Sequence, residues 1–294
     1  MIQHFGQLLK IKLSITVVFS AMIGYLLGFK MFNLEHFVYL TFGGLLVTGS
    51  ANTFNQILER KQDKLMQRTE NRPLPMRRIS VAQAAFFALA IGFAGLFLLN
   101  KINPQGTFYG IMSKSSFFGL ISILLYVLSY TPLKRVSTIS IFVGAIPGAI
   151  PFLLGYVAAT DNFALAAGTL FAIQFFWQFP HFIAIAWVQH DDYKKAGFKM
   201  LFGGVKNKYP ATISIISSIF MTLISVTPFF FNISGLRLSL YAFLVVFLLG
   251  SWFTLKSVKL YITMTDTSAR DLMLSSFAYL PLIQLVFVLD RFLS

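Results

Sequence analysis

Nine long apolar segments follow one another along this chain, and they limit what it can fold into. A helix needs about 20 apolar residues to cross the hydrocarbon layer of a membrane. Only 12% of the residues are charged, whereas a soluble domain carries about 25%. Backbone amides in lipid must pair within their own segment, and the alternating pattern of a barrel is missing, so we expect helices. The predicted spans are residues 10–29, 37–58, 82–100, 116–132, 138–158, 163–188, 211–231, 237–256 and 272–290.

These spans are predicted to form one all-α membrane domain over residues 1–294. No linker is long enough to separate two domains, and the sequence shows no convincing internal repeat. The first apolar segment is too long for a signal peptide and lacks a small-residue cleavage site, so we expect it to remain as the first span. The chain has no cysteine, which excludes disulfides and cysteine metal ligands.

The charged residues predict how the chain lies in the membrane. With the N-terminus in the cytoplasm and the C-terminus outside, 19 of the 24 Lys and Arg residues fall in cytoplasmic segments, as the positive-inside rule expects. The net charge of +14 therefore reflects topology, and we expect no nucleic-acid partner. Seven of the ten acidic residues lie on the same side. The positive-inside rule does not explain these acidic residues, so we expect a function on the cytoplasmic face that requires both acidic and basic side chains.

The end of the second predicted span carries the first candidate site. Asn55, Glu59 and Asp63 recur every four residues and so share one helical face. Two carboxylates and an amide can hold Mg²⁺, which takes oxygen ligands and often shares them with phosphates. Arg68 and Arg72 follow with the same spacing, and arginine suits phosphate oxygens. The alternative is a solvated helix end with structural ion pairs.

The order of these residues resembles the first acidic motif of the UbiA family of intramembrane prenyltransferases. In that family an N-xxx-D-xxx-D element precedes R-T-x-x-R-P, and Glu59 here replaces the usual middle Asp. Further elements resemble the branch of the family that farnesylates haem, and the resemblance runs from about residue 10 to 290. These elements are Tyr130 to Arg135, Gly144 to Pro151, Trp177 to Phe182, Asp191 to Gly197, Ala269 with Arg270, and Ser275 to Pro281.

The resemblance implies a UbiA-like helical bundle with its active site on the cytoplasmic side of a bacterial cell membrane. It implies transfer of the farnesyl group of farnesyl diphosphate to a vinyl group of protoheme IX, with addition of water, giving haem O and pyrophosphate. Mg²⁺ is the implied cofactor, whereas haem b is a substrate. Haem A synthase is a candidate partner, although no segment marks an interface for it. The implied catalytic residues are Asn55, Glu59, Asp63, Arg68, Arg72 and His181. The implied substrate-binding residues are Tyr130, Lys134, Arg135, Trp177, Gln178, Asp191, Asp192, Tyr193 and Lys195.

Several of these residues also have a plain structural interpretation. Two basic residues such as Lys134 and Arg135 are ordinary in a cytoplasmic loop, and Tyr130, Trp177 and Tyr193 fit interfacial aromatic belts. Asp191 and Asp192 fit the solvated exit of a span. The wider family carries a second D-xxx-D motif here, but this chain has Lys195 and Ala196 at the following positions, which puts a second metal site in doubt.

His181 lies within an apolar segment, where ionisable groups are costly and therefore candidates for function. It is predicted either to pack through a hydrogen bond, to contact the porphyrin at its iron or near the vinyl group, or to handle a proton or water.

Two other functions remain open from the sequence. A related prenyltransferase of quinone synthesis would act on an aromatic acceptor, but the Trp177 to Phe182 element and the missing second D-xxx-D motif argue against it. A transporter would show paired halves and charges at mid-membrane depth, whereas the charges here gather at one face.

Overall fold

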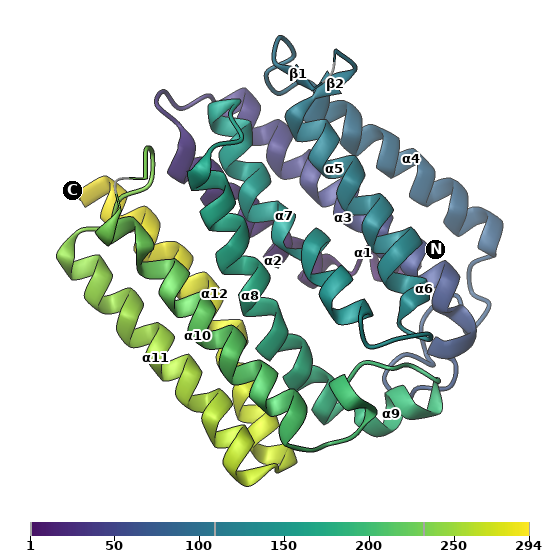
Figure 1. Ribbon diagram of the computed structural model, residues 1–294. Helices are drawn as coiled ribbons and strands as arrows, with labels where there is room; N and C mark the ends of the chain where they lie inside the picture. The colour runs from purple at the N-terminus through teal and green to yellow at the C-terminus, as the bar shows by residue number, and fades with distance from the viewer. Residues whose placement is uncertain (1, 109, 232, 294) are drawn as a thin grey trace.

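The structure is a computed structural model that describes residues 2–108, 110–231 and 233–293, and helices dominate it (Figure 1). The helices of the first half are α1 (Ile2–Leu9), α2 (Ile11–Gly28), α3 (Leu34–Asp63), α4 (Val81–Asn100), α5 (Lys114–Leu124), the π-helical turn η1 (Leu125–Tyr130) and α6 (Thr131–Leu133). The second half contains α7 (Ser140–Thr160), α8 (Leu165–Val188), α9 (His190–Lys195), the 3₁₀ turn η2 (Phe202–Gly204), α10 (Lys208–Phe230), α11 (Leu240–Thr263) and α12 (Asp266–Leu293). The strands β1 (Thr107–Phe108) and β2 (Met112–Ser113) form a small antiparallel hairpin.

Eight segments of the described chain are long and apolar enough to cross a membrane. They are α2, α4, the continuous α5–η1–α6, α7, α8, α10, α11 and α12, and each coincides with a predicted span. The remaining predicted span, 37–58, falls within α3. That helix has 30 residues and is about 45 Å long, but the polar residues of its second half keep it out of the apolar set. The all-α membrane fold is confirmed, and nine is an approximate number of crossings.

Two predicted loops are partly helical. The helix α3 continues through Glu59 to Asp63, and α11 and α12 together leave only a short turn at Met264 and Thr265. Met264 has a φ of 49°, a left-handed conformation that ends α11. Charged side chains at these helix ends find partners in other segments: Asp63 pairs with Arg72 beyond the end of α3, and Lys256 pairs with Asp271 across the turn between α11 and α12.

The charged segments gather at one end of the bundle. The segment 64–80, α6, α9 and the turn between α11 and α12 lie at the lower end of Figure 1, whereas the β-hairpin and the C-terminus lie at the upper end. This arrangement agrees with the predicted separation of cytoplasmic and outer loops. The direction of the termini across a membrane stays a prediction.

Small residues allow α2 and α7 to pack closely in the centre of the bundle. A methyl group on Gly155 would collide with the backbone carbonyl of Ala21, and one on Gly24 would collide with that of Phe152. Close backbone approach through small residues is a common way to pack helices in membranes, where no hydrophobic effect drives association between helices. The α2–α7 contact therefore fixes the position of α2, whose first residue follows Lys10.

Gly155→Ala is expected to lower the free energy of unfolding by about 1–3 kcal/mol, because the added methyl group forces the two backbones apart. The measurement is reversible unfolding in detergent, followed by circular dichroism. Gly168→Ala is the control, because a methyl group at this α8 position meets no other atom within 4 Å. An equal loss of stability in both variants would contradict the packing argument.

Candidate active site

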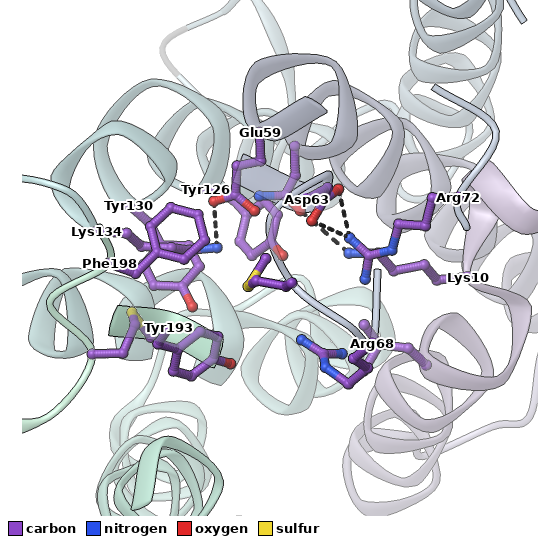
Figure 2. A pocket seen from close by; sticks show the side chains of 14 residues that line it. Lys10, Glu59, Asp63, Arg68, Arg72, Tyr126, Tyr130, Lys134, Tyr193 and Phe198 are labelled. Carbon is purple, nitrogen blue, oxygen red and sulfur yellow. Dashed lines mark hydrogen bonds and ion pairs between the residues drawn. The ribbon is translucent and has the colours of Figure 1, made fainter. Parts of the chain in front are cut away.

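A cavity of about 340 Å³ lies at the charged end of the bundle (Figure 2). Its lining combines four basic, two acidic and three tyrosine side chains with apolar ones, so it carries an excess of two positive charges when all four basic side chains are protonated. The lining residues are Lys10, Leu13, Asn55, Glu59, Asp63, Met66, Arg68, Arg72, Tyr126, Tyr130, Lys134, Tyr193, Phe198 and Met200.

The helix α3 supplies one wall of this cavity. Asn55, Glu59 and Asp63 are buried and all line it, so the predicted helical face is confirmed. Figure 2 shows Glu59 and Asp63 on one side of the cavity, with Arg68 and Tyr193 across from them.

Arg72 neutralises the most deeply buried carboxylate of the cavity. The side chain of Asp63 is only 1% exposed, and Arg72 Nη1 donates to both of its oxygens, at 2.9 and 2.8 Å. A buried charge without such a partner would be strongly destabilising. The Thr69 hydroxyl donates to the Asp63 carbonyl at 2.8 Å, which folds the chain back after α3. In the R-T-x-x-R element, Thr69 therefore fixes the course of the chain after α3, and Arg72 supplies the positive charge that pairs with Asp63.

Lys134 forms the second ion pair of the cavity. Its Nζ lies 2.7 Å from Glu59 Oε1, and both side chains are at most one-tenth exposed. The ring centroid of Tyr130 lies 4.4 Å from the same Nζ, which places the ammonium group over an aromatic face. Burial alone would lower the pKa of Lys134, but the adjacent Glu59 carboxylate raises it above its usual value. Lys134 therefore stays charged.

Lys10 is a cavity residue that the sequence did not reveal. It separates α1 from α2 with a φ of 47°, and its Nζ donates to Asn55 Oδ1 at 3.2 Å. Gln56 Nε2 donates to the Leu8 carbonyl at 2.8 Å, which holds this break against α3. Burial, with the positive charges of Arg72 and then Lys134, lowers the pKa of Lys10 to about 7. A nearby anion would favour the charged form of this amine. No residue pattern predicts the helix break, so the sequence identifies Lys10 only as one of the basic residues expected on the cytoplasmic side.

A hydrogen-bond chain sets the orientation of the Asn55 amide. Its Nδ2 donates to Thr131 Oγ1 at 3.2 Å, while the Thr131 hydroxyl donates to the Tyr126 carbonyl at 2.8 Å. Thr131 has only one proton to donate, so it must accept from Asn55. The amide oxygen of Asn55 therefore faces Lys10 and the cavity. The π-helical turn η1, a rare element that often marks functional sites, places Thr131 for this task.

The three predicted metal ligands fit a hard divalent cation. All offer oxygen atoms to the same cavity, and oxygen is what Mg²⁺ binds. The buried Glu59 Oε1 has the Lys134 ion pair but no aligned hydrogen bond among the described residues, so it keeps capacity for a further ligand. Within the described ranges no three Asp, Glu or His side chains cluster tightly enough to hold a metal alone. Mg²⁺ takes six oxygen ligands, so three residues leave coordination positions for water or for the oxygen atoms of an anionic ligand.

Several predicted site residues lie outside the cavity lining. Arg135 and Asp191 are exposed, and Lys195 is exposed and pairs with Asp192 at 3.7 Å along α9. Gln178 is buried and donates to the Ala145 carbonyl at 2.9 Å, so it ties α8 to α7. Their substrate-binding roles stay predictions.

His181 lies beyond the cavity, among aromatic side chains between α8 and α12. Its ring stacks on Trp177 at 4.6 Å between centroids and meets the edge of Phe277 at 5.1 Å. Trp177 Nε1 donates to the Ser276 carbonyl at 3.1 Å. Phe182 contacts both His181, at 5.6 Å, and the cavity residue Tyr130, at 6.5 Å, which connects the two places.

The hydrogen bonds of Ser276 assign the tautomer of His181. The Ser276 hydroxyl donates to the Met273 carbonyl at 2.6 Å and lies 2.8 Å from His181 Nδ1. Because the hydroxyl proton is already used, Nδ1 must carry a proton and donate to Ser276. The lone pair of a neutral His181 then lies on Nε2, where it can accept a proton or bind a metal.

The fold and the cavity together define a polytopic helical membrane protein with a cavity rich in basic and acidic side chains at one end of its bundle. The sequence profile of the UbiA prenyltransferase family matches residues 17–280. The chain belongs to this family and is an intramembrane prenyltransferase by its fold and relatives.

Its relatives are similar over nearly their full length. A protein of Flavobacterium psychrophilum named protoheme IX farnesyltransferase is 48% identical over 98% of this chain and 94% of its own. A protein of the same name from Cytophaga hutchinsonii is 40% identical over 98% of both chains.

Solved structures share the fold at low identity. One, from work on digeranylgeranylglyceryl phosphate synthase, has a TM-score of 0.80 at 19% identity and covers 98% of both chains. A UbiA homologue from Archaeoglobus fulgidus bound to DMAPP and Mg²⁺ has a TM-score of 0.71 at 16% identity, over 94% of this chain and 99% of its own.

Thr131→Val is expected to weaken binding of inorganic diphosphate in the presence of Mg²⁺ by roughly tenfold, because Asn55 loses the acceptor that orients its amide. Isothermal titration calorimetry on the purified chain measures this change. Thr131→Ser keeps the hydroxyl and should bind like the wild type. Wild-type affinity in the valine variant would contradict the assigned orientation.

Proposed function

We propose that this chain transfers the farnesyl group of farnesyl diphosphate to a vinyl group of protoheme IX, forming haem O and pyrophosphate. Relatives that are 40–48% identical over almost the whole chain are named protoheme IX farnesyltransferases, which supports this choice of donor and acceptor. The single observation that carries the proposal is the cavity in which basic groups and oxygen ligands converge. An allylic diphosphate needs both, because its leaving group is a polyanion.

The basic side chains of the cavity bind and stabilise the leaving group. Lys134, Arg72, Arg68 and Lys10 donate to the phosphate oxygens as the bond between farnesyl C1 and the diphosphate oxygen breaks. Donors already aimed at the place where charge develops lower the barrier without reorganisation. Mg²⁺, which a UbiA homologue binds together with DMAPP, would supply further charge neutralisation when held by Asn55, Glu59 and Asp63.

The acceptor half of the reaction takes place on the side of His181. The vinyl group attacks the farnesyl C1, a carbon–carbon bond forms, and water captures the cation that remains on the haem side chain and gives up a proton. The free Nε2 lone pair of His181 is the base that accepts this proton. Apolar surroundings keep bulk water from reaching the farnesyl cation before the vinyl group does.

The membrane orientation is part of the proposal. The cavity is placed at the cytoplasmic face, with the N-terminus inside, the C-terminus outside and the farnesyl tail between helices. The distribution of Lys and Arg supports this assignment.

Asp63→Asn and Arg72→Ala are each expected to lower haem O formation at least about 100-fold, because the first removes a carboxylate ligand of the metal and the second removes a cation that binds the diphosphate. The measurement is mass spectrometry of haems extracted from membranes that express the chain. Asp266→Asn is the control, since Asp266 is largely exposed and pairs with Lys206 outside the cavity. Normal haem O formation by well-inserted Asp63→Asn protein would contradict the proposed site.

His181→Asn is expected to lower haem O formation at least about tenfold, because the asparagine amide can replace the Nδ1 donor to Ser276 but offers no Nε2 lone pair. The thermal midpoint in detergent should stay close to the wild-type value, because the hydrogen bond to Ser276 is kept. Full product formation by a stable His181→Asn protein would show that Nε2 has no part in the reaction.

A further inference from the structure

All three predicted metal ligands are in contact with basic side chains. Each contact joins one oxygen-bearing residue of α3 to a cation from a different segment of the chain. The contacts are Lys10 Nζ to Asn55 Oδ1 at 3.2 Å, Lys134 Nζ to Glu59 Oε1 at 2.7 Å, and Arg72 Nη1 to Asp63 Oδ2 at 2.8 Å. A divalent cation that approaches these oxygen atoms therefore competes with three positive groups that already hold them.

The overall charge of the cavity strengthens this competition. With Lys10 protonated, its lining carries two more positive than negative charges, and a divalent cation alone would double that excess. The carboxylates of Glu59 and Asp63 are buried, so water screens this repulsion poorly. A diphosphate changes the sign of the balance because it brings several negative charges and many acceptor oxygens.

We propose that Lys10, Arg72 and Lys134 guard the metal ligands, so that the site takes a divalent cation together with a diphosphate and rejects the free cation. When the diphosphate arrives, the three basic groups donate to its phosphate oxygens and release the oxygen atoms of Asn55, Glu59 and Asp63. Metal and diphosphate then bind with positive coupling, and each raises the affinity for the other by the same factor.

The side chains can make this exchange without a rearrangement of the backbone. Lysine has a long flexible stem with three rotatable donors, and Lys134 is held in the cavity by the Tyr130 ring as well as by Glu59. Lys10 is the clearest test position, because its partner is the neutral amide of Asn55. Its removal leaves no buried charge without a partner.

The inference rests on the proposed function, because it takes a prenyl diphosphate as the anion. The test uses Mn²⁺ as the metal and farnesyl S-thiolodiphosphate, an unreactive analogue, as the anion. The full chain in lipid nanodiscs is titrated with Mn²⁺, and electron paramagnetic resonance reports the free ion. The titration is done with and without the analogue, and complex formation between Mn²⁺ and the analogue in buffer is measured separately.

The analogue is expected to tighten Mn²⁺ binding to the wild type at least about tenfold. Lys10→Met is expected to bind Mn²⁺ alone at least about threefold more tightly than the wild type, with a smaller gain from the analogue. Lys134→Met should change in the same direction. Lys206→Met is the matched control: it removes a lysine that pairs with Asp266 outside the cavity, and its Mn²⁺ affinity should equal that of the wild type.

Two results overturn the inference. One is wild-type Mn²⁺ affinity that is the same with and without the analogue, and the other is a folded Lys10→Met protein that binds Mn²⁺ alone no more tightly than the wild type. Equilibrium dialysis of the analogue at saturating Mn²⁺ separates the first of these results from failure of the proposed function. A bound analogue with unchanged Mn²⁺ affinity overturns the inference, whereas a wild type that binds no analogue at all contradicts the proposed function.

Discussion

Two buried ion pairs hold the functional end of this bundle together, Lys134 with Glu59 and Arg72 with Asp63. Removing one member of a buried pair leaves an uncompensated charge and costs about 3–5 kcal/mol. Burying these pairs costs desolvation free energy, and replacement of a buried ion pair by apolar residues often gives equal or greater stability. Their presence is therefore better explained by ligand binding than by stability.

Irregular backbone positions these charges around α3. The left-handed residue Lys10 ends α1 and directs its amine into the cavity, and the π-helical turn η1 brings Thr131 to Asn55. Segment 64–80 folds back through Thr69 so that Arg72 reaches Asp63. Regular helices alone would leave these groups on separate faces. The apolar helices form the frame of the protein, and the irregular segments between them bring the charged side chains to the cavity.

The sequence predicts the parts of the structure that depend on the length of an apolar segment or on the helical repeat. Membrane spans follow from the lengths of apolar runs, and the shared face of Asn55, Glu59 and Asp63 follows from a spacing of four residues. Lys10 could not be predicted, because its role depends on a backbone break and on packing against α3. The loop of Asp191 carries charges that suited the cavity, but the residues of this loop that line it are Tyr193, Phe198 and Met200. Which side chains of a short helix turn inward depends on tertiary packing and not on composition.

The central claim is that the carboxylates and basic groups at the end of α3 bind the diphosphate of a prenyl substrate. The most direct test is an experimental structure of the chain with farnesyl S-thiolodiphosphate and Mg²⁺. The account predicts phosphate oxygens within hydrogen-bond distance of Arg72 and Lys134, with Asn55, Glu59 and Asp63 facing the metal. A diphosphate bound elsewhere, with Arg72 still on Asp63 and Lys134 still on Glu59, would contradict it.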